Sequence, residues 1–421
     1  MLQKKILEIK NSSFFHDIIH SFFSRGFSLG LGFLVTILIT RNFSVEVFGE
    51  YSFLLSIAMT CFQFAHLGFS SANTYYVVHN KKILPFLLAN TQILGLVVGL
   101  VSLIVLLILN NIYFHRDVSL IVVTSFLVPF LVITELNRGL LTGLDKIKIA
   151  NNLDVLSKVI YTLMVIAVII YFQSIWSLLF AYVMQMFIYS STSFYNLFKK
   201  AQNKFKPSIN LFIKTSNYSI RIYITLFLSF LVLKIDVYFI EYFMGKKPLG
   251  IYSLAATLAT HLILIVQVVI PLLLPKLSTL KSTIDRLQKL GNILSYALVL
   301  LVAINIGFYF LGEWFIVLVF GDKYLESVSI IQILLMATSV LALETILAQY
   351  YAFIGKIKFL ILYWMITLVI NMILNYLWIP KYGISGAAWS SLISYSIILI
   401  LLLSKTIYGA YLLLNKNENT I

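Results

Sequence analysis

Two arginines stand inside long apolar stretches, where a charged side chain is energetically unfavourable. Arg25 lies in "FFSRGFSLG" and Arg221 in "NYSIRIYIT", each near the start of its own stretch. The guanidinium group is permanently charged and offers a planar fork of donors, so it suits phosphate oxygens. The pair therefore predicts a site for a phosphate group, with extension of both side chains to lipid headgroups as the alternative.

Four more charged residues are expected in the inner, cytoplasmic half of the apolar stretches, as Arg25 and Arg221 are. Glu135 and Arg138 occur in "ITELNRG", and Asp154 and Lys158 in "NNLDVLSKV". Spacings of three and four residues place each pair on one helix face, where the two charges can neutralise each other. The alternative is that Arg138 and Lys158 face a cavity for an anionic group, with Asp154 and Glu135 as candidates for coupling to H⁺ or Na⁺.

Two further stretches place charges within apolar sequence. Glu344, in "LALETILAQ", lies near mid-depth with no basic residue within four positions. Such a carboxylate needs a partner or a proton, which makes Glu344 the first candidate for ion coupling. In "FLVLKIDVYFIEYF", Lys234 and Asp236 lie in the outer third of a predicted span. They are expected either to line the outer mouth of a pathway, with Asp236 as a further coupling candidate, or to reach the interface.

The elements that position these residues are membrane-spanning helices. Hydrophobic residues make up 60% of the 421 residues and charged residues only 11%, which excludes a soluble globular chain. A span needs about 20 apolar residues, and about twelve segments qualify. They begin near Phe14, Val47, Ile83, Val118, Ile149, Ile175, Thr215, Leu249, Gly291, Val328, Phe359 and Tyr382.

The basic residues are unevenly distributed about these spans. With a cytoplasmic N-terminus, about 20 Lys and Arg fall in cytoplasmic loops and about 6 in outer loops. This bias predicts both termini in the cytoplasm and explains the formal net charge of +15 without a nucleic-acid partner. Because Cys61 is the one cysteine, an internal disulfide and a cysteine-based metal cluster are excluded. No metal site and no bound cofactor are predicted.

An internal repeat divides the chain into halves. "FGEYSF" at Phe48 recurs as "LGIYSL" at Leu249, and "DKIKI" at Asp145 recurs as "GKIKF" at Gly355, each about half the chain length later. Both pairs occupy equivalent places in a six-plus-six topology, which indicates a parallel repeat. We therefore expect six-helix bundles at residues 1–198 and 215–421, joined by a cytoplasmic linker at 199–214.

Three stretches resemble a known family. "LKIDVYFIEYFMGKKPLGIYSLAA", "RNFSVEVFGEYSFLLS" and "PKYGISGAAWSSLISY" are similar to patterns in polysaccharide flippases of the Wzx type, within the multidrug/oligosaccharidyl-lipid/polysaccharide (MOP) exporter superfamily. The resemblance covers nearly the whole chain. It implies a V-shaped, all-α membrane protein with two bundles around a cavity that opens alternately to each side of the bacterial cytoplasmic (inner) membrane.

The implied substrate is a polyprenyl (undecaprenyl)-pyrophosphate-linked oligosaccharide, moved to the outer leaflet for O-antigen, capsule or other polysaccharide synthesis. Its pyrophosphate would be held by cations of the cavity. The candidates are Arg25, Arg221, Arg138, Lys158 and Lys234. Expected partners are this substrate, membrane lipids, and the polysaccharide polymerase and chain-length regulator, with the flippase itself a monomer.

Other functions remain as alternatives. A multidrug exporter of the same superfamily would need an acidic cavity, which Arg25 and Arg221 oppose. A peptidoglycan-precursor flippase would share the physics but is expected to have two further C-terminal spans. An enzyme such as a membrane polymerase needs a sizeable extramembrane site or paired carboxylates, and neither is evident, so no catalytic residue is predicted. A scaffold would need neither repeat nor buried charges.

Overall fold

The computed structural model describes residues 13–261, 280, 282–355 and 358–418, with side chains except at 13–19, 221–222 and 412–418. All regular secondary structure in this part of the chain is helical. Eleven of its helices are long and apolar enough to cross a membrane. The predicted span that begins near Leu249 is helical over residues 246–261 and then leaves the described residues. The prediction of an all-α multi-pass membrane protein is therefore confirmed.

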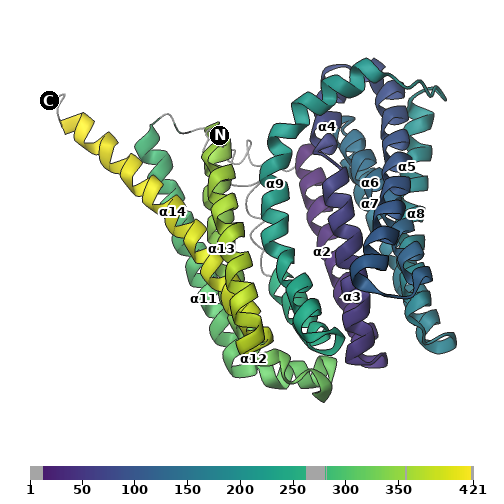
Figure 1. Ribbon diagram of the computed structural model, residues 1–421. Helices are drawn as coiled ribbons and strands as arrows, with labels where there is room; N and C mark the ends of the chain where they lie inside the picture. The colour runs from purple at the N-terminus through teal and green to yellow at the C-terminus, as the bar shows by residue number, and fades with distance from the viewer. Residues whose placement is uncertain (1–12, 262–279, 281, 356–357, 419–421) are drawn as a thin grey trace. The chain divides into compact units, whose positions relative to one another are not determined.

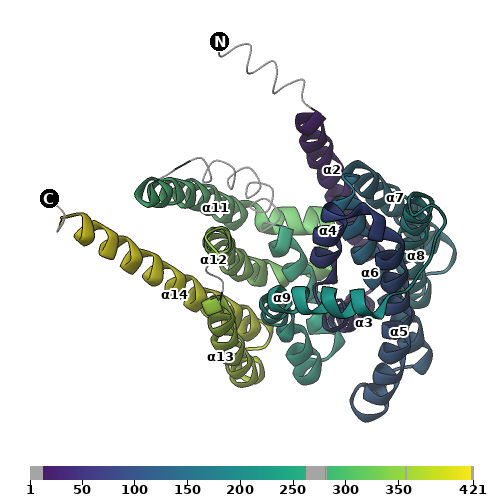
Figure 2. The same ribbon diagram turned by 90° about the horizontal axis from the view of Figure 1, so that it is seen from above.

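Contacts divide the chain into two compact units (Figures 1 and 2). Unit 1 comprises Met1–Ser44 and Leu54–Ile224, and unit 2 comprises Val45–Phe53 and Thr225–Ile421. Two continuous helices, α3 (Val45–Ala65) and α9 (Ile209–Met244), contribute residues to both units. The predicted boundaries at 198 and 215 remain predictions.

Unit 1 is organised around one buried helix. Helix α6 packs against α4, α5, α7 and α8, while α2 packs along α7 (Figure 2). The bounds of these helices are α2 Ser13–Asn42, α4 Phe69–His79, α5 Leu84–Leu109, α6 Val118–Gly143, α7 Ile147–Tyr171 and α8 Ile175–Lys200. Short helical turns at Lys81–Ile83 and Asn110–Phe114 flank α5. The charged stretches around Glu135 and Asp154 therefore lie on neighbouring helices.

Small residues and caps fix several helix ends and contacts. The Asp117 carboxylate accepts hydrogen bonds from the Ser119 backbone and side chain at the start of α6, and these bonds lower the pKa of Asp117. Between α3 and α4 the backbone turns at Leu67 and Gly68, both with positive φ. Helix α4 then lies so close to α6 that a Cβ added to Gly139 would overlap the Ser70 carbonyl oxygen.

In unit 2, helix α12 is the most enclosed element. It packs against α11 and α14, and α13 packs against α14. The bounds are α11 Thr283–Phe320, α12 Ser327–Phe353, α13 Lys358–Tyr382 and α14 Ile384–Glu418, with a short turn at Asp322–Tyr324.

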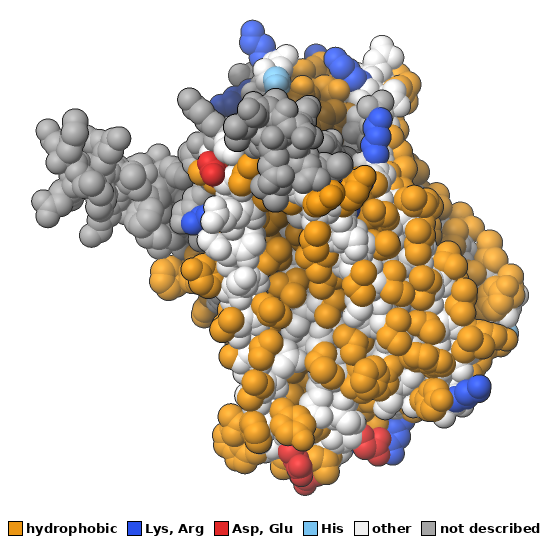
Figure 3. Space-filling view, turned by 90° about the vertical axis from the view of Figure 1, so that its left-hand side faces the viewer, with side chains coloured by type: hydrophobic (Ala, Val, Ile, Leu, Met, Phe, Trp, Pro, Cys, Tyr) orange, Lys and Arg blue, Asp and Glu red, His pale blue; other side chains and the backbone are white. Residues whose placement is uncertain are grey.

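Helix α11 exposes hydrophobic side chains such as Tyr296, Val299 and Phe310. Figure 3 shows one face of the molecule, on which hydrophobic side chains dominate the middle and charged ones lie toward its upper and lower ends. This pattern fits a surface in contact with lipid.

The repeated Gly-x-Tyr-Ser motifs lie next to each other within unit 2. A Cβ added to Gly49 would overlap the Lys246 carbonyl oxygen, and one added to Gly250 would overlap the Val45 carbonyl oxygen. Since α3 begins at Val45 and the helix of residues 246–261 begins at Lys246, each glycine approaches the first residue of the other helix. Both copies thus need glycine for the same reason. Nearby, the buried Glu50 carboxylate pairs with the Lys246 ammonium at 2.8 Å.

Candidate functional site

Five of the predicted charged residues come together in unit 1, from three helices. The group consists of Arg25 of α2, Glu135 and Arg138 of α6, and Asp154 and Lys158 of α7, and we call it the cationic cluster. Arg25 interacts electrostatically with both Arg138 and Asp154. Arg138 also interacts with Glu135. Residues separated by more than a hundred positions therefore share one local field.

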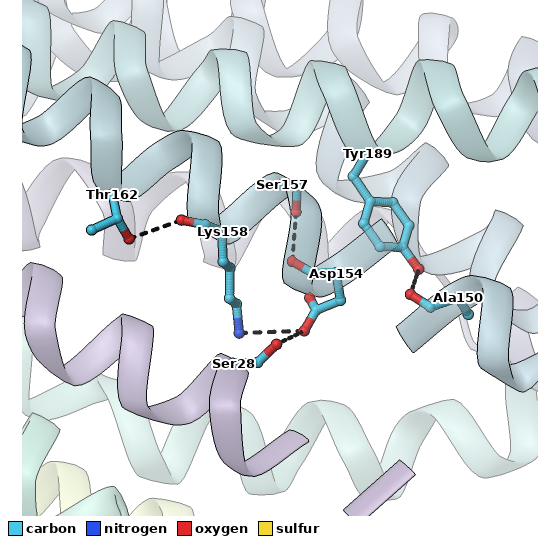
Figure 4. Close-up of polar contacts among 7 residues, drawn as sticks. All are labelled: Ser28, Ala150, Asp154, Ser157, Lys158, Thr162 and Tyr189. Carbon is cyan, nitrogen blue, oxygen red and sulfur yellow. Dashed lines mark hydrogen bonds and ion pairs between the residues drawn. The ribbon is translucent and has the colours of Figure 1, made fainter. Parts of the chain in front are cut away.

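The Asp154 carboxylate contacts two other side chains, one of them from another helix (Figure 4). The Ser28 hydroxyl donates to Asp154 Oδ2 at 2.6 Å from α2. Lys158 Nζ lies 3.5 Å from the same oxygen, one turn along α7. Lys158 and Asp154 thus form the intrahelical pair that their spacing suggested, and the carboxylate also joins α7 to α2. Whether Lys158 additionally contacts a ligand remains a prediction.

The cluster has an excess of positive charge. Arg25, Arg138 and Lys158 outnumber the carboxylates of Glu135 and Asp154 by one. Arg25 is exposed, Arg138 is half-buried, and the side chains of Lys158 and Asp154 are 27% and 26% exposed. A ligand can therefore reach these groups, and partial burial strengthens their interaction with an anion relative to bulk water. The chemistry available is charge-assisted hydrogen bonding to anionic oxygens.

Neighbouring contacts hold the three helices in register. Asn151 Nδ2 donates to Ser21 Oγ at 2.9 Å, which ties α7 to α2 a second time. The Tyr189 hydroxyl of α8 donates to the Ala150 carbonyl at 3.3 Å (Figure 4). On α6, the Glu135 carbonyl accepts from Ser70 Oγ of α4 at 3.1 Å. The positions of the charged side chains therefore depend on polar contacts between helices.

The sequence did not point to three neighbours of Asp154: Ser28, Tyr182 and Tyr189. The two tyrosines interact electrostatically with Asp154. Ser28 follows Arg25 by three residues, so their shared helix face was a usable signal. No comparable signal exists for Tyr182 and Tyr189. They are brought to α7 by the packing of α8, and nothing in their local sequence distinguishes them from the other tyrosines.

Other predicted residues lie elsewhere. Arg221 is in the part of α9 that belongs to unit 1, but its side chain is outside the described part of the structure. A phosphate site formed jointly by Arg25 and Arg221 therefore stays a prediction. Lys234 and Asp236 belong to unit 2. Asp236 is buried, accepts from the Tyr252 hydroxyl and from Val237 N, and interacts electrostatically with Lys234. A spacing of two residues places the two side chains on different helix faces, yet their charges still interact.

Glu344 lies inside unit 2, on α12. It is 2% exposed, and its Oε1 has no hydrogen-bond partner among the residues that the structure describes. Its role in ion coupling remains a prediction. Across the described ranges, no group of three or more His, Cys, Asp or Glu side chains could hold a metal ion.

Several solved structures share this fold. "Lipid II flippase MurJ, inward closed conformation" aligns with a TM-score of 0.77 at 16% identity, over 92% of this chain and 87% of that one. An inward-facing multidrug resistance MATE family transporter of the MOP superfamily aligns with a TM-score of 0.75 at 14% identity, over 91% and 95%. A MOP superfamily transporter from Pyrococcus furiosus, described as having a binding pocket of reverse polarity, aligns with a TM-score of 0.61 at 13% identity, over 93% of this chain and 95% of that one.

A sequence comparison identifies the family of the chain. No curated protein matches the chain, but the family model described as "Polysaccharide biosynthesis protein" matches residues 14–281. That match covers well over half of the chain and includes every residue of the cationic cluster. The chain therefore belongs to the polysaccharide biosynthesis protein family and has the fold of MOP-superfamily flippases and transporters.

Proposed function

We propose that the chain is a flippase for polyprenyl (undecaprenyl)-pyrophosphate-linked oligosaccharides. It moves repeat units of O-antigen, capsule or a related polysaccharide from the cytoplasmic to the outer leaflet of a bacterial cytoplasmic membrane. The supporting observation is the cationic cluster of unit 1, a group with excess positive charge on a chain of the polysaccharide biosynthesis family. Neutral sugars need no such cluster, whereas the pyrophosphate that links them to lipid does.

In this proposal each charged residue has its own task. Arg25, which is exposed, meets the pyrophosphate first through its planar fork of donors. Arg138 and Lys158 add electrostatic attraction for the pyrophosphate. Asp154 pairs with Lys158 and accepts from Ser28, which holds both side chains in place. Because Asp154 and Glu135 offset part of the positive charge, the affinity for the anion stays low enough for its release. Alternating access then releases it on the far side, with Glu344 as the candidate for H⁺ or Na⁺ coupling.

A second candidate is a flippase for the peptidoglycan precursor, favoured by the fold shared with a lipid II flippase. A multidrug exporter is less well supported, since an excess of positive charge repels cationic drugs. All three candidates are distinguished by the cargo that is moved.

The test is transport in proteoliposomes that contain the full chain. A fluorescent polyprenyl-pyrophosphate oligosaccharide is offered, and its appearance in the opposite leaflet is followed for the intact chain and for Arg25→Ala. We expect flipping by the intact chain and a loss of roughly tenfold or more in the variant, because a charge-assisted bond is removed.

The matched control is Arg41→Ala, at the other end of α2. It should flip at the rate of the intact chain. Equal rates for Arg25→Ala and Arg41→Ala would remove Arg25 from the mechanism. An intact chain that moves lipid II but no other polyprenyl-pyrophosphate glycan would select the second candidate, and one that expels organic cations instead would select the exporter.

A further inference from the structure

The proposed function gives no role to a group of aromatic side chains in unit 1. Tyr75 and Tyr76 of α4 and Tyr218 of α9 form what we call the tyrosine platform. The rings of Tyr75 and Tyr218 are stacked, with centroids 4.7 Å apart and an interplanar angle of 19°. The Tyr76 ring meets both of the other rings edge to face. Residues from two helices distant in sequence thus build one ordered aromatic surface.

The tyrosine platform is accessible and has a basic rim. Tyr75 and Tyr218 are 40% and 37% exposed. Lys214 Nζ lies 5.7 Å from the centre of the Tyr76 ring, and the His79 ring lies 4.2 Å from that of Tyr75. Burial and the neighbouring phenols raise the pKa of Tyr76, so its hydroxyl remains a donor. The surface therefore combines aromatic faces with hydrogen-bond donors.

The tyrosine platform is also fixed to the cationic cluster through α4. Ser70 Oγ donates to the Glu135 carbonyl, and Thr74 Oγ1 donates to the Gly139 carbonyl at 2.9 Å. These bonds use one face of α4, while Tyr75 and His79 lie on the exposed face. A ligand on the platform therefore meets a surface that is hydrogen-bonded to α6, the helix of Glu135 and Arg138.

Helix α9 adds a second link. Lys214, Tyr218 and Arg221 follow one another at spacings of four and three residues, so the three positions share one helix face. Tyr218 and Arg221 are about 4.5 Å apart along the axis. Position 221 therefore lies about one helical turn from the tyrosine platform, on the same face of α9.

We propose that the tyrosine platform is a saccharide subsite that binds the pyranose ring next to the pyrophosphate. The inference rests on the proposed function, and it assigns the sugar to residues outside the cationic cluster. The C–H face of a pyranose packs on an aromatic ring, while its hydroxyls accept from donors such as Tyr76 and Lys214. An aromatic belt at the membrane interface is the competing explanation, and it predicts no preference for sugar.

The test compares two probes on the purified full chain: a polyprenyl pyrophosphate, and the same lipid with one N-acetylhexosamine attached. Tyr218→Ala is expected to weaken binding of the sugar-bearing probe by about tenfold and of the bare probe by less than about twofold. Tyr218→Phe, which keeps the ring, should retain most of the affinity. Tyr171→Ala, at a position 76% exposed at the end of α7, is the control and should change neither.

Each result decides the question. Equal weakening of both probes by a folded Tyr218→Ala variant, or no weakening of either, would overturn the saccharide subsite while leaving the proposed function in place. If the intact chain binds neither probe, the proposed function fails and the subsite with it. Thermal unfolding of Tyr218→Ala and Tyr218→Phe establishes that both variants are folded.

Discussion

Both units hold carboxylates within their helices, but the surroundings differ. In unit 1, Asp154 is 26% exposed, accepts from Ser28 and pairs with Lys158, beside further cations. In unit 2, Asp236 and Glu344 are 4% and 2% exposed. Asp236 is bonded to Tyr252, within the repeat motif. The accessible group can respond to a ligand, whereas the burial and hydrogen bonds of Asp236 lead us to expect that it stabilises its own unit. On this view an intramembrane charge acquires its role from its surroundings.

The largest effect is expected at Asp236. Removing one partner of a buried polar group leaves the others uncompensated, so Asp236→Ala should lower the free energy of unfolding by about 3–5 kcal/mol. Tyr252→Phe should lower it less, by about 1.5–3 kcal/mol, because one hydrogen bond to a charged group is lost while Val237 N still donates to the carboxylate. Tryptophan fluorescence during thermal unfolding in detergent measures both. An unchanged melting temperature for Asp236→Ala would show that the carboxylate is not structural.

At the cationic cluster, the expected effect is on ligand binding and not on stability. Arg25→Ala should weaken binding of a bare polyprenyl pyrophosphate by about 10- to 100-fold, and Arg25→Lys by less, since lysine keeps the charge but not the fork. Equilibrium titration of the purified chain gives the affinities. If Arg25→Lys and Arg25→Ala bind equally weakly while melting well below the intact chain, Arg25 is structural, which is the role expected of Asp236.

A smaller effect is expected from His66, which follows the end of α3 in unit 1. Burial lowers the pKa of His66 to about 4, and its Nδ1 accepts from Gly68 N at 3.0 Å. Between pH 6.5 and 4 the unfolded chain binds a proton that folded His66 does not, so stability falls as the pH drops through this range. Melting temperatures recorded across it should fall more for the intact chain than for His66→Gln, and parallel curves would exclude His66.

The smallest effect has the opposite sign. Asp154→Asn removes one negative charge while leaving an acceptor for Ser28. Since Asp154 is partly exposed, the lost pairing with Lys158 should cost at most about 1 kcal/mol of stability. The freed positive charge should strengthen binding of the bare polyprenyl pyrophosphate by about two- to fivefold at low salt, and less at high salt. Titrations at two ionic strengths measure this gain.

Much of the fold follows from the sequence, because composition and length determine membrane helices almost alone. The recurrence of Gly49 and Gly250 also had a structural meaning, since both glycines permit the same close approach. The Asp154–Lys158 pair was predictable because it depends only on spacing along one helix. Ser28 and Tyr189 show the limit: they reach α7 from other helices, and the rotation of packed helices is set by side chains along their whole length, not by a local motif.

The most direct test of the cationic cluster is one titration of polyprenyl pyrophosphate onto three proteins: the intact chain, Arg25→Ala and Asp154→Asn. If the cluster binds the pyrophosphate, the two variants must shift the affinity in opposite directions, weaker for Arg25→Ala and tighter for Asp154→Asn. Shifts in the same direction, or no shift in either, would contradict a binding role for these charges and leave them as structural ion pairs.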